Sequence, residues 1–134
     1  MNPIVVKFGG SSLATAGQFE KVAAIIRENP GRRYVVASAP GKRFSGDTKV
    51  TDLLYRCYDA ACAGQDFAPV LDEIRQRFAD IISELQLQVD LVPDFAAIEA
   101  HLRTSPQRDY MASRGEYLNL SLIHISEPTR HAQI

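Results

Sequence analysis

The sequence is short of three features that each mark a class of protein: net charge, cysteine and long apolar runs. Its formal net charge is -1 over 134 residues, so no basic field predicts binding to nucleic acid or to an anionic membrane. No apolar run approaches the roughly 20 residues that a membrane-spanning helix needs. The N-terminus also lacks the pattern of a signal peptide. We therefore expect a soluble cytoplasmic domain whose partners include neither nucleic acid nor membrane.

Cysteine and histidine are too sparse to predict a metal site. Cys57 and Cys62 are the only cysteines, and their spacing matches no common zinc motif. The three histidines are scattered along the chain and add no cluster of ligands. We expect two ordinary thiols on a helix, in a reducing compartment, and no metal held by protein side chains.

What the sequence does contain is an alternation of strand and helix patterns. Short β-branched runs at 4–8 and 33–38 predict two buried strands. Apolar residues spaced three and four apart predict a helix between them, up to about Glu28. A strand–helix–strand order is typical of a parallel sheet with helices on its faces. We therefore predict an α/β fold with a mainly parallel sheet.

A polar loop at 39–49 follows the second strand, and helical patterns follow the loop. Long loops at the carboxyl ends of parallel strands are where α/β folds keep their ligands. The patterns predict helices near 51–63, over 67–85 and from Pro93, and a last element that starts at Pro106. One face of the 67–85 helix carries a run of charges that we expect to be solvated, namely Asp72, Glu73, Arg75, Arg77, Asp80 and Glu84.

Three segments carry residues suited to chemistry, and the first lies between the first strand and its helix. It reads Lys7-Phe8-Gly9-Gly10-Ser11-Ser12. Glycines without a Cβ let a phosphate approach backbone N–H groups at a helix N-terminus, and Lys7 adds a full charge beside them. The segment therefore predicts phosphate binding. An ordinary strand-to-helix turn with an exposed lysine explains the same residues equally well, and the segment is neither a Walker A motif nor a dinucleotide fingerprint.

The second segment joins the end of the second strand to the start of the next helix. Ser38 ends the second strand near the point where Lys7 ends the first. Two adjacent parallel strands, about 5 Å apart, would aim both side chains at one crevice. Thr51 stands at the start of the following helix, where an N-cap is an alternative explanation for it.

The third segment is Ser113-Arg114-Gly115-Glu116-Tyr117-Leu118-Asn119. A glycine inside an apparently helical stretch is unfavourable by about 1 kcal/mol, and a broken local rule often marks a site. A single carboxylate such as Glu116, near a cationic phosphate-binding loop, would suit an ammonium group on a substrate. A surface partner for a residue one helical turn away is the commoner role of a glutamate, so both interpretations stay open.

The three segments together resemble the motifs of the aspartate kinases, which have the amino-acid-kinase fold. The first segment is similar to the opening signature of that family, and residues 35–54 and 113–119 are similar to its second and third motifs. The three occur in the family's order and cover roughly residues 2–119. The resemblance implies a three-layer α/β/α sandwich, incomplete in this chain because the family's later strands and nucleoside-binding half lie beyond Asn119.

The resemblance also implies an activity, the transfer of the γ-phosphoryl group of ATP to the β-carboxylate of L-aspartate. That reaction is the first step of lysine, threonine and methionine synthesis. Mg²⁺ would bridge the phosphates of ATP, and the full-length parent is expected to be a homo-oligomer. The alternatives are another acyl-phosphate-forming amino-acid kinase and a non-catalytic phosphate-binding fragment.

Residue by residue, the resemblance assigns one group to ATP and another to aspartate. Lys7 would be catalytic. Ser38 and Thr51 would contact aspartate, and Glu116 would bind its α-ammonium group. The ATP phosphates would be held by the opening signature, through Lys7, Phe8, Gly9, Gly10 and Ser11.

After Asn119 the chain departs from the family. Residues 120–130 resemble the translation of a DNA-library adapter. His131, Ala132 and Gln133 would then cover its variable index, and Ile134 would begin its constant tail. We expect 1–119 to be the N-terminal part of an amino-acid-kinase catalytic domain and 120–134 to be non-native. A genuine short strand, suggested by the β character of Leu122, Ile123 and Ile125, is the alternative. On this interpretation the chain is truncated, folds poorly alone and is inactive as a kinase.

Overall fold

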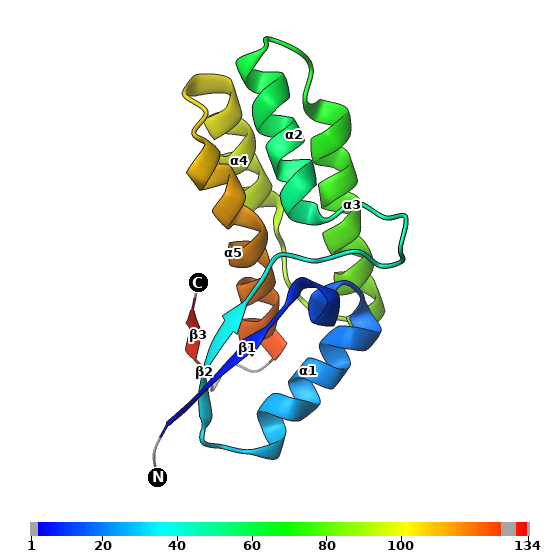
Figure 1. The fold of residues 1–134 in the computed structure, drawn as a ribbon, viewed down its shortest axis with the longest axis vertical. Helices are drawn as coiled ribbons and strands as arrows, with labels where there is room; N and C mark the ends of the chain where they lie inside the picture. Colours follow the sequence, from blue (N-terminus) through cyan, green and yellow to red (C-terminus); the bar gives the residue numbers. More distant parts are fainter. Residues whose placement is uncertain (1–2, 127–130, 134) are drawn as a thin grey trace.

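Two parallel strands open the fold, which the computed structural model describes for residues 3–126 and 131–133 (Figure 1). They are β1 (Ile4–Phe8) and β2 (Arg32–Ala37), and each pairs with the other along its length. β-Branched and aromatic residues dominate both, as suits a pleated and partly covered surface. Their parallel pairing confirms the α/β prediction made from the sequence.

The connection between these strands is helical. The 3₁₀ helix η1 (Gly10–Leu13) leads into α1 (Ala16–Glu28). The N-cap of α1 is Thr15, whose side-chain oxygen accepts a hydrogen bond from the backbone N–H of Gln18. The apolar stripe predicted for this helix faces the core, and the buried residues of α1 are Ala16, Phe19, Val22 and Ile26.

Four helices follow β2 and form the upper part of the molecule in Figure 1. α2 lies within this group and contacts α3, α4 and α5. α5 extends from the group down behind the strands and contacts β2 and β3. A proline in the first turn of α3 and of α4 marks where each helix begins. The bounds are α2 (Val50–Cys62), α3 (Ala68–Leu85), α4 (Val92–Thr104) and α5 (Arg108–Ser126).

A third strand, β3 (His131–Gln133), pairs parallel with β2 and completes the order β1-β2-β3. The strand suggested at 122–125 is wrong, because these residues lie in α5, where Leu122 and Ile123 are buried. α5 also runs through the predicted boundary after Asn119 without a break. The non-native origin of 120–134 stays a prediction, and residues 127–130 and 134 of that segment lie outside the described residues.

The two cysteines lie on α2, as the sequence predicts, in different surroundings. Cys57 is buried and Cys62 is exposed, and both are free thiols. Burial raises the pKa of the Cys57 thiol to about 11, because the thiolate would lose its hydration in the core. Cys57 therefore packs as a small apolar residue and is a poor nucleophile.

One residue of the α3 charge run contradicts its predicted exposure. Arg77 is 4% exposed, whereas the sequence analysis expected it on a solvated face. Its position explains the burial, because it belongs to the i, i+3, i+4, i+7 series of Ile74, Phe78 and Ile81, which are all buried. The sequence prediction grouped Arg77 with its charged neighbours because of its own charge. The helical period places it on the apolar stripe instead.

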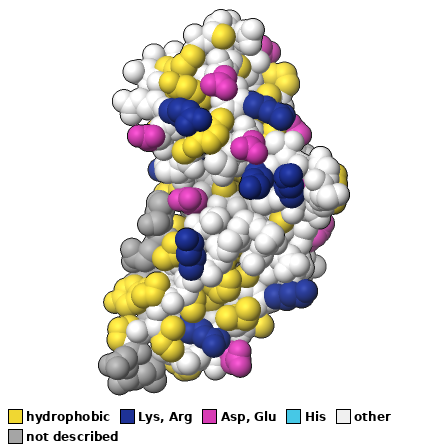
Figure 2. All heavy atoms as spheres, viewed as in Figure 1, with side chains coloured by type: hydrophobic (Ala, Val, Ile, Leu, Met, Phe, Trp, Pro, Cys, Tyr) yellow, Lys and Arg dark blue, Asp and Glu magenta, His cyan; other side chains and the backbone are white. Residues whose placement is uncertain are grey.

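The surface carries both signs of charge without a large field of either. Figure 2 shows Lys and Arg interspersed with Asp and Glu over the face it draws. Within residues 3–126 and 131–133, no helix has the length and apolar character needed to cross a membrane. The same residues contain no cluster of three or more His, Cys, Asp or Glu side chains that could hold a metal ion.

Candidate active site

A polar cleft of about 570 Å³ lies where β2, α2 and α5 converge on the turn after β1. Its walls come from four stretches that are far apart in the sequence. Such convergence at the carboxyl end of parallel strands is the usual place for a ligand site in an α/β fold. The lining residues are Gly10, Ser11, Ser38, Ala39, Pro40, Gly41, Lys42, Lys49, Thr51, Asp52 and Glu116.

The cleft brings together five of the eight residues that the sequence analysis selected: Gly10, Ser11, Ser38, Thr51 and Glu116. The other three, Lys7, Phe8 and Gly9, do not line it. Phe8 is buried in the core, and Gly9 is the N-cap of η1. Lys7 is exposed on β1, opposite Val36 of β2. The expected shared crevice therefore contains Ser38 and lacks Lys7 among its lining residues.

Two glycines let the first and second segments meet backbone to backbone. The N–H of Gly41 donates a hydrogen bond of 2.9 Å to the carbonyl of Gly10. A Cβ on Gly41 would lie 2.6 Å from the carbonyl carbon of Gly10, and one on Gly10 would lie 3.1 Å from the carbonyl oxygen of Ala39. Any larger side chain at Gly41 would therefore push the two walls apart.

Ser38 is fixed from two sides. Its N–H donates to the carbonyl of Phe8 at 3.1 Å, which extends the pairing of β1 and β2 by one step. Its carbonyl accepts a hydrogen bond of 2.7 Å from the side-chain amide of Asn119 on α5. Asn119 is fully buried, so this bond ties the third segment to the second inside the core. The sequence analysis quoted Asn119 in its motif and gave it no role.

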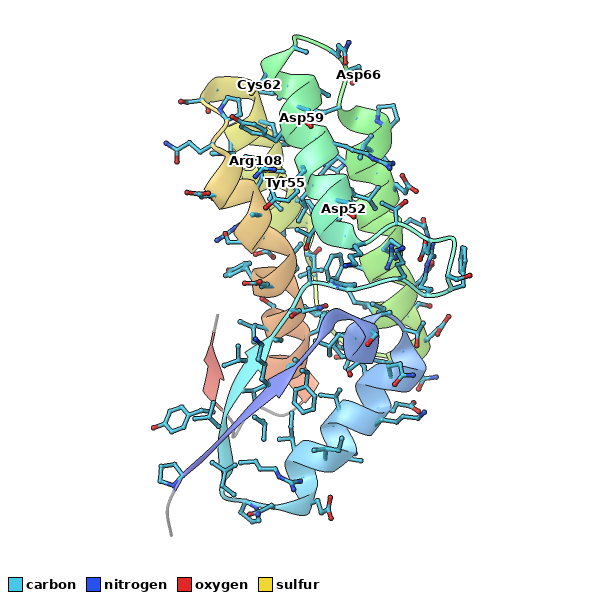
Figure 3. All side chains as sticks on the ribbon, viewed as in Figure 1. Asp52, Tyr55, Asp59, Cys62, Asp66 and Arg108 are labelled. Atoms are coloured by element: carbon cyan, nitrogen blue, oxygen red, sulfur yellow. The ribbon has the colours of Figure 1, made fainter. Side chains whose placement is uncertain are left out.

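Thr51 is the second residue of α2, and it is not the N-cap of that helix. The N-cap position belongs to Lys49, whose side chain makes no capping hydrogen bond. The capping explanation for Thr51 is therefore wrong, and a threonine at this position of the cleft is not explained by helix capping. Asp52 follows in the first turn, and Figure 3 shows it at the end of α2 nearest the loop. Backbone N–H groups of this first turn carry partial positive charge towards the cleft.

Gly115 allows α5 to bring Glu116 to the cleft. A Cβ at Gly115 would lie 2.4 Å from the Cβ of Ala39 and 3.3 Å from a methyl group of Leu54. The glycine that costs about 1 kcal/mol in an isolated helix is therefore required by close packing. The sequence indicated that a glycine inside this helix is unusual. The structure gives the reason, because Ala39 packs directly against Gly115.

The charges around the cleft are mixed. Lys42 and Lys49 provide two exposed cations at opposite ends of the 39–49 loop, and Asp52 and Glu116 provide two carboxylates. Phosphates suit the lysines and the backbone N–H groups, whereas an ammonium group suits the carboxylates. The arrangement can therefore hold a ligand that carries both charges. The two lysines and Asp52 lie within the second motif, but no role for them was predicted from the sequence pattern.

Comparisons with known proteins agree with this geometry. Residues 2–130 match the model of the "Amino acid kinase family". Aspartokinase 3 of Bacillus subtilis (strain 168) is 39% identical over 126 residues, which are 89% of this chain and 28% of that protein. The aspartokinase of Chlamydia muridarum is 32% identical over 126 residues, with 90% and 26% covered.

Solved structures give the same result. The aspartate kinase of Clostridium acetobutylicum superposes with a TM-score of 0.90 at 42% identity, over 93% of this chain and 29% of that one. E. coli aspartokinase III, solved in complex with aspartate and ADP, superposes with a TM-score of 0.69 at 24% identity, with 96% and 29% covered. The chain thus spans less than a third of the length of these relatives. It belongs to the amino acid kinase family.

Proposed function

We propose that residues 1–119 form the N-terminal part of the catalytic domain of an aspartokinase. The full protein would transfer the γ-phosphoryl group of ATP to the β-carboxylate of L-aspartate. The observation that supports this most is the convergence of three separate motifs, through Gly10, Ser38, Thr51 and Glu116, on one cleft. Similarity to aspartokinases at 39% and 42% identity supports the same assignment.

In this proposal, the turn after β1 holds the phosphates. Gly9, Gly10 and Ser11 would offer backbone N–H groups, and Phe8 would anchor the turn from the core. Lys7 would act in catalysis by neutralising charge on the phosphoryl group as it moves. Lys7 is exposed on β1, and its flexible stem of four carbons gives the ammonium group reach beyond its own strand.

The opposite wall would hold aspartate. Ser38 and Thr51 would donate hydrogen bonds to its carboxylates, and Glu116 would pair with its α-ammonium group. A carboxylate acceptor is already ionised at neutral pH, so no general base is needed. One oxygen of the β-carboxylate forms a bond to the γ-phosphorus while the bond from that phosphorus to ADP breaks, and ADP leaves with the electron pair.

The cofactor assignment is ATP with Mg²⁺. Mg²⁺ usually binds through substrate phosphates and one or two carboxylates, and with Glu116 assigned to the ammonium group the described cleft residues leave Asp52 as the carboxylate nearest this role, without a dedicated acidic cage. When bound, the ion would neutralise charge between the transferring phosphates. We further propose a cytoplasmic, homo-oligomeric parent protein that acts in lysine and threonine synthesis.

The test is a substrate panel on the full-length protein that contains residues 1–119. We expect ADP release that depends on L-aspartate, with at least tenfold lower kcat/KM for L-glutamate and N-acetylglutamate. Preference for another acceptor would move the chain to a different acyl-phosphate-forming kinase. The 134-residue chain assayed beside it should show no turnover, because it spans only 29% of the aspartate kinase that it superposes on.

A further inference from the structure

A buried cation stands behind the cleft without lining it. Arg77 lies in the middle of α3 and is 4% exposed. Its guanidinium donates 2.6 Å to the carbonyl of Gly41 and 2.8 Å to the carbonyl of Thr48. The same group lies 3.6 Å from the carboxylate of Asp47. All three partners belong to the loop between β2 and α2, which Figure 1 shows running across α3.

Burying this charge is costly, so its position calls for an explanation. An arginine on the apolar stripe of a helix loses its hydration and must recover it from hydrogen bonds and an opposite charge. Burial lowers the pKa of Arg77, and nearby Arg43 lowers it further, while Asp47 acts in the opposite direction. A leucine or methionine would fill the same stripe without this cost. What the arginine adds is a rigid fork of donors that reaches two carbonyls at once.

The two carbonyls stand at the two ends of one loop. Gly41 lies near the end of the 38–42 stretch that lines the cleft after β2, and it touches Gly10 through the hydrogen bond described above. Thr48 immediately precedes Lys49 and the first turn of α2, which line the other side of the opening. Arg77 therefore acts as a clasp that holds the loop close to the two points where it leaves the cleft wall and returns to it.

Asp47 connects the clasp to the middle of the loop. Its carboxylate accepts hydrogen bonds from Arg43 Nε at 2.7 Å, from Arg43 Nη2 at 3.0 Å and from the backbone N–H of Arg43 at 3.0 Å. These bonds, with help from the backbone of Thr48 and the charge of Arg77, hold the pKa of Asp47 well below its usual range. Glu73 and Asp80 of α3 also face Arg43 with their charges. The loop is thus closed on itself and fastened to α3.

We propose that Arg77 is a positioning residue that sets the aspartate side of the cleft, by fastening the 41–49 loop to α3. The inference rests on the proposed function for the identity of the ligand. The turn after β1 touches Gly41 through its bond to Gly10, and it also has hydrogen bonds of its own at η1, such as that from Ser12 N–H to the Gly9 carbonyl. Because the turn after β1 keeps these bonds, we expect a loosened clasp to displace Thr51 at the start of α2 more than that turn.

The experiment compares Arg77→Lys with Arg75→Lys in the full-length protein. Lysine keeps the charge at position 77 and cannot bridge two carbonyls with a planar fork. Arg75 is the matched control, because it lies on the same helix and pairs with Asp72 and Glu99, away from the loop. The readouts are amide hydrogen exchange across the chain and steady-state kinetics with each substrate varied in turn.

For Arg77→Lys we expect exchange of the 41–48 amides to rise at least tenfold, with the amides of α3, α4 and β2 unchanged. We also expect KM for aspartate to rise about tenfold, with KM for ATP within about threefold of wild type. Arg75→Lys should change neither readout. A merely structural arginine would reduce the folded fraction, which lowers apparent kcat and leaves both KM values in place.

The outcomes separate this inference from the proposed function. Faster exchange throughout the chain, or unchanged exchange in the loop, overturns the positioning role. Equal rises in both KM values overturn its assignment to the aspartate side. If the wild-type protein does not phosphorylate aspartate, the proposed function fails, and hydrogen exchange alone decides whether Arg77 fastens the loop.

Discussion

Two hollows of nearly equal size, about 570 Å³ and 550 Å³, lie on this molecule and differ in almost everything else. The first is the polar cleft. The second is an apolar groove between α3 and α4, to which the connecting segment contributes Val89 and Leu91. The groove is lined by Arg75, Phe78, Ala79, Ile82, Ser83, Val89, Leu91, Val92, Phe95, Ala96 and Glu99.

The difference lies in where the lining residues come from. The groove is built from a single stretch, 75–99, and its base is the edge-to-face contact of Phe78 with Phe95, whose ring centroids are 6.2 Å apart. Two successive amphipathic helices create such a hollow by packing alone. The cleft needs four distant stretches, two glycine contacts and a buried asparagine. The volume of a hollow is therefore a poor indicator of function in this molecule. The convergence of polar groups from distant segments is a better one.

The largest expected effect follows from replacing Lys7, which carries charge beside the cleft from outside its lining. In the full-length protein, Lys7→Met should lower kcat by about 10²–10³, because preorganised charge at the transferring phosphoryl group is lost. Thermal unfolding should be unchanged, since the side chain is exposed. Steady-state kinetics with ATP and aspartate measures it. A variant within a few-fold of wild type would remove Lys7 from the site.

Gly115 tests whether the cleft depends on close packing. Gly115→Ala should destabilise the protein by about 1–3 kcal/mol, because the new Cβ would lie 2.4 Å from the Cβ of Ala39. Gly17→Ala in α1 is the matched control, since its Cβ would meet only the Thr15 hydroxyl at 4.0 Å. That control should stabilise by about 0.4–1 kcal/mol. Urea unfolding of both variants measures the two changes in the free energy of unfolding. Changes of the same sign would contradict the close-packing explanation for Gly115.

Glu116 tests the division of the cleft into two sides. Glu116→Gln should weaken aspartate by roughly ten- to a hundredfold, because a hydrogen bond to a charged group is worth about 1.5–3 kcal/mol. KM for ATP should change by less than about threefold. Isothermal titration with each ligand, alongside kinetics, separates the two effects. Similar losses for both substrates, or for neither, would count against the assignment of Glu116 to the ammonium group.

The sequence predicted the strands and helices around this cleft better than the long-range hydrogen bonds that hold its walls in place. The β1 bounds and the α1 stripe follow from local periodicity, which acts over a few residues. Arg77 was missed because its partners, Gly41 and Thr48, are 36 and 29 residues away, and no local pattern encodes such pairing. Asn119 lay within a quoted motif, yet its bond to Ser38 spans 81 residues. Long-range contacts fix what local propensity leaves open.

The groove was likewise beyond prediction, for a different reason. The periodic patterns in the sequence predict helices over 67–85 and from Pro93, and the periodicity marks an apolar face on each. Stripe width alone does not say where two helices diverge and leave a hollow between them. Phe78 and Phe95 are buried, while Val92, at the start of α4, is 71% exposed where it lines the groove.

The smallest expected effects compare one exposed residue from each hollow. Ser11→Ala removes a hydroxyl from the cleft, and Val92→Ser adds one to the groove. Both side chains are exposed, so each substitution should change the free energy of unfolding by less than about 0.5 kcal/mol. Only the cleft variant should affect a ligand. We expect the Ser11 hydroxyl to add one hydrogen bond to phosphate besides that of its backbone N–H. Loss of that bond, about 0.5–1.5 kcal/mol, predicts a two- to tenfold rise in KM for ATP with Ser11→Ala.

The Val92→Ser variant is the sharper of the two tests, because it predicts no change where a hollow of equal size exists. KM for ATP and for aspartate should both stay within about 1.5-fold of wild type when measured in parallel. A shift in either value would mean that the groove communicates with the cleft through α3, the helix that carries both Phe78 and Arg77. The separation of the two hollows would then fail, and the clasp on the 41–49 loop would be the first place to look for the coupling.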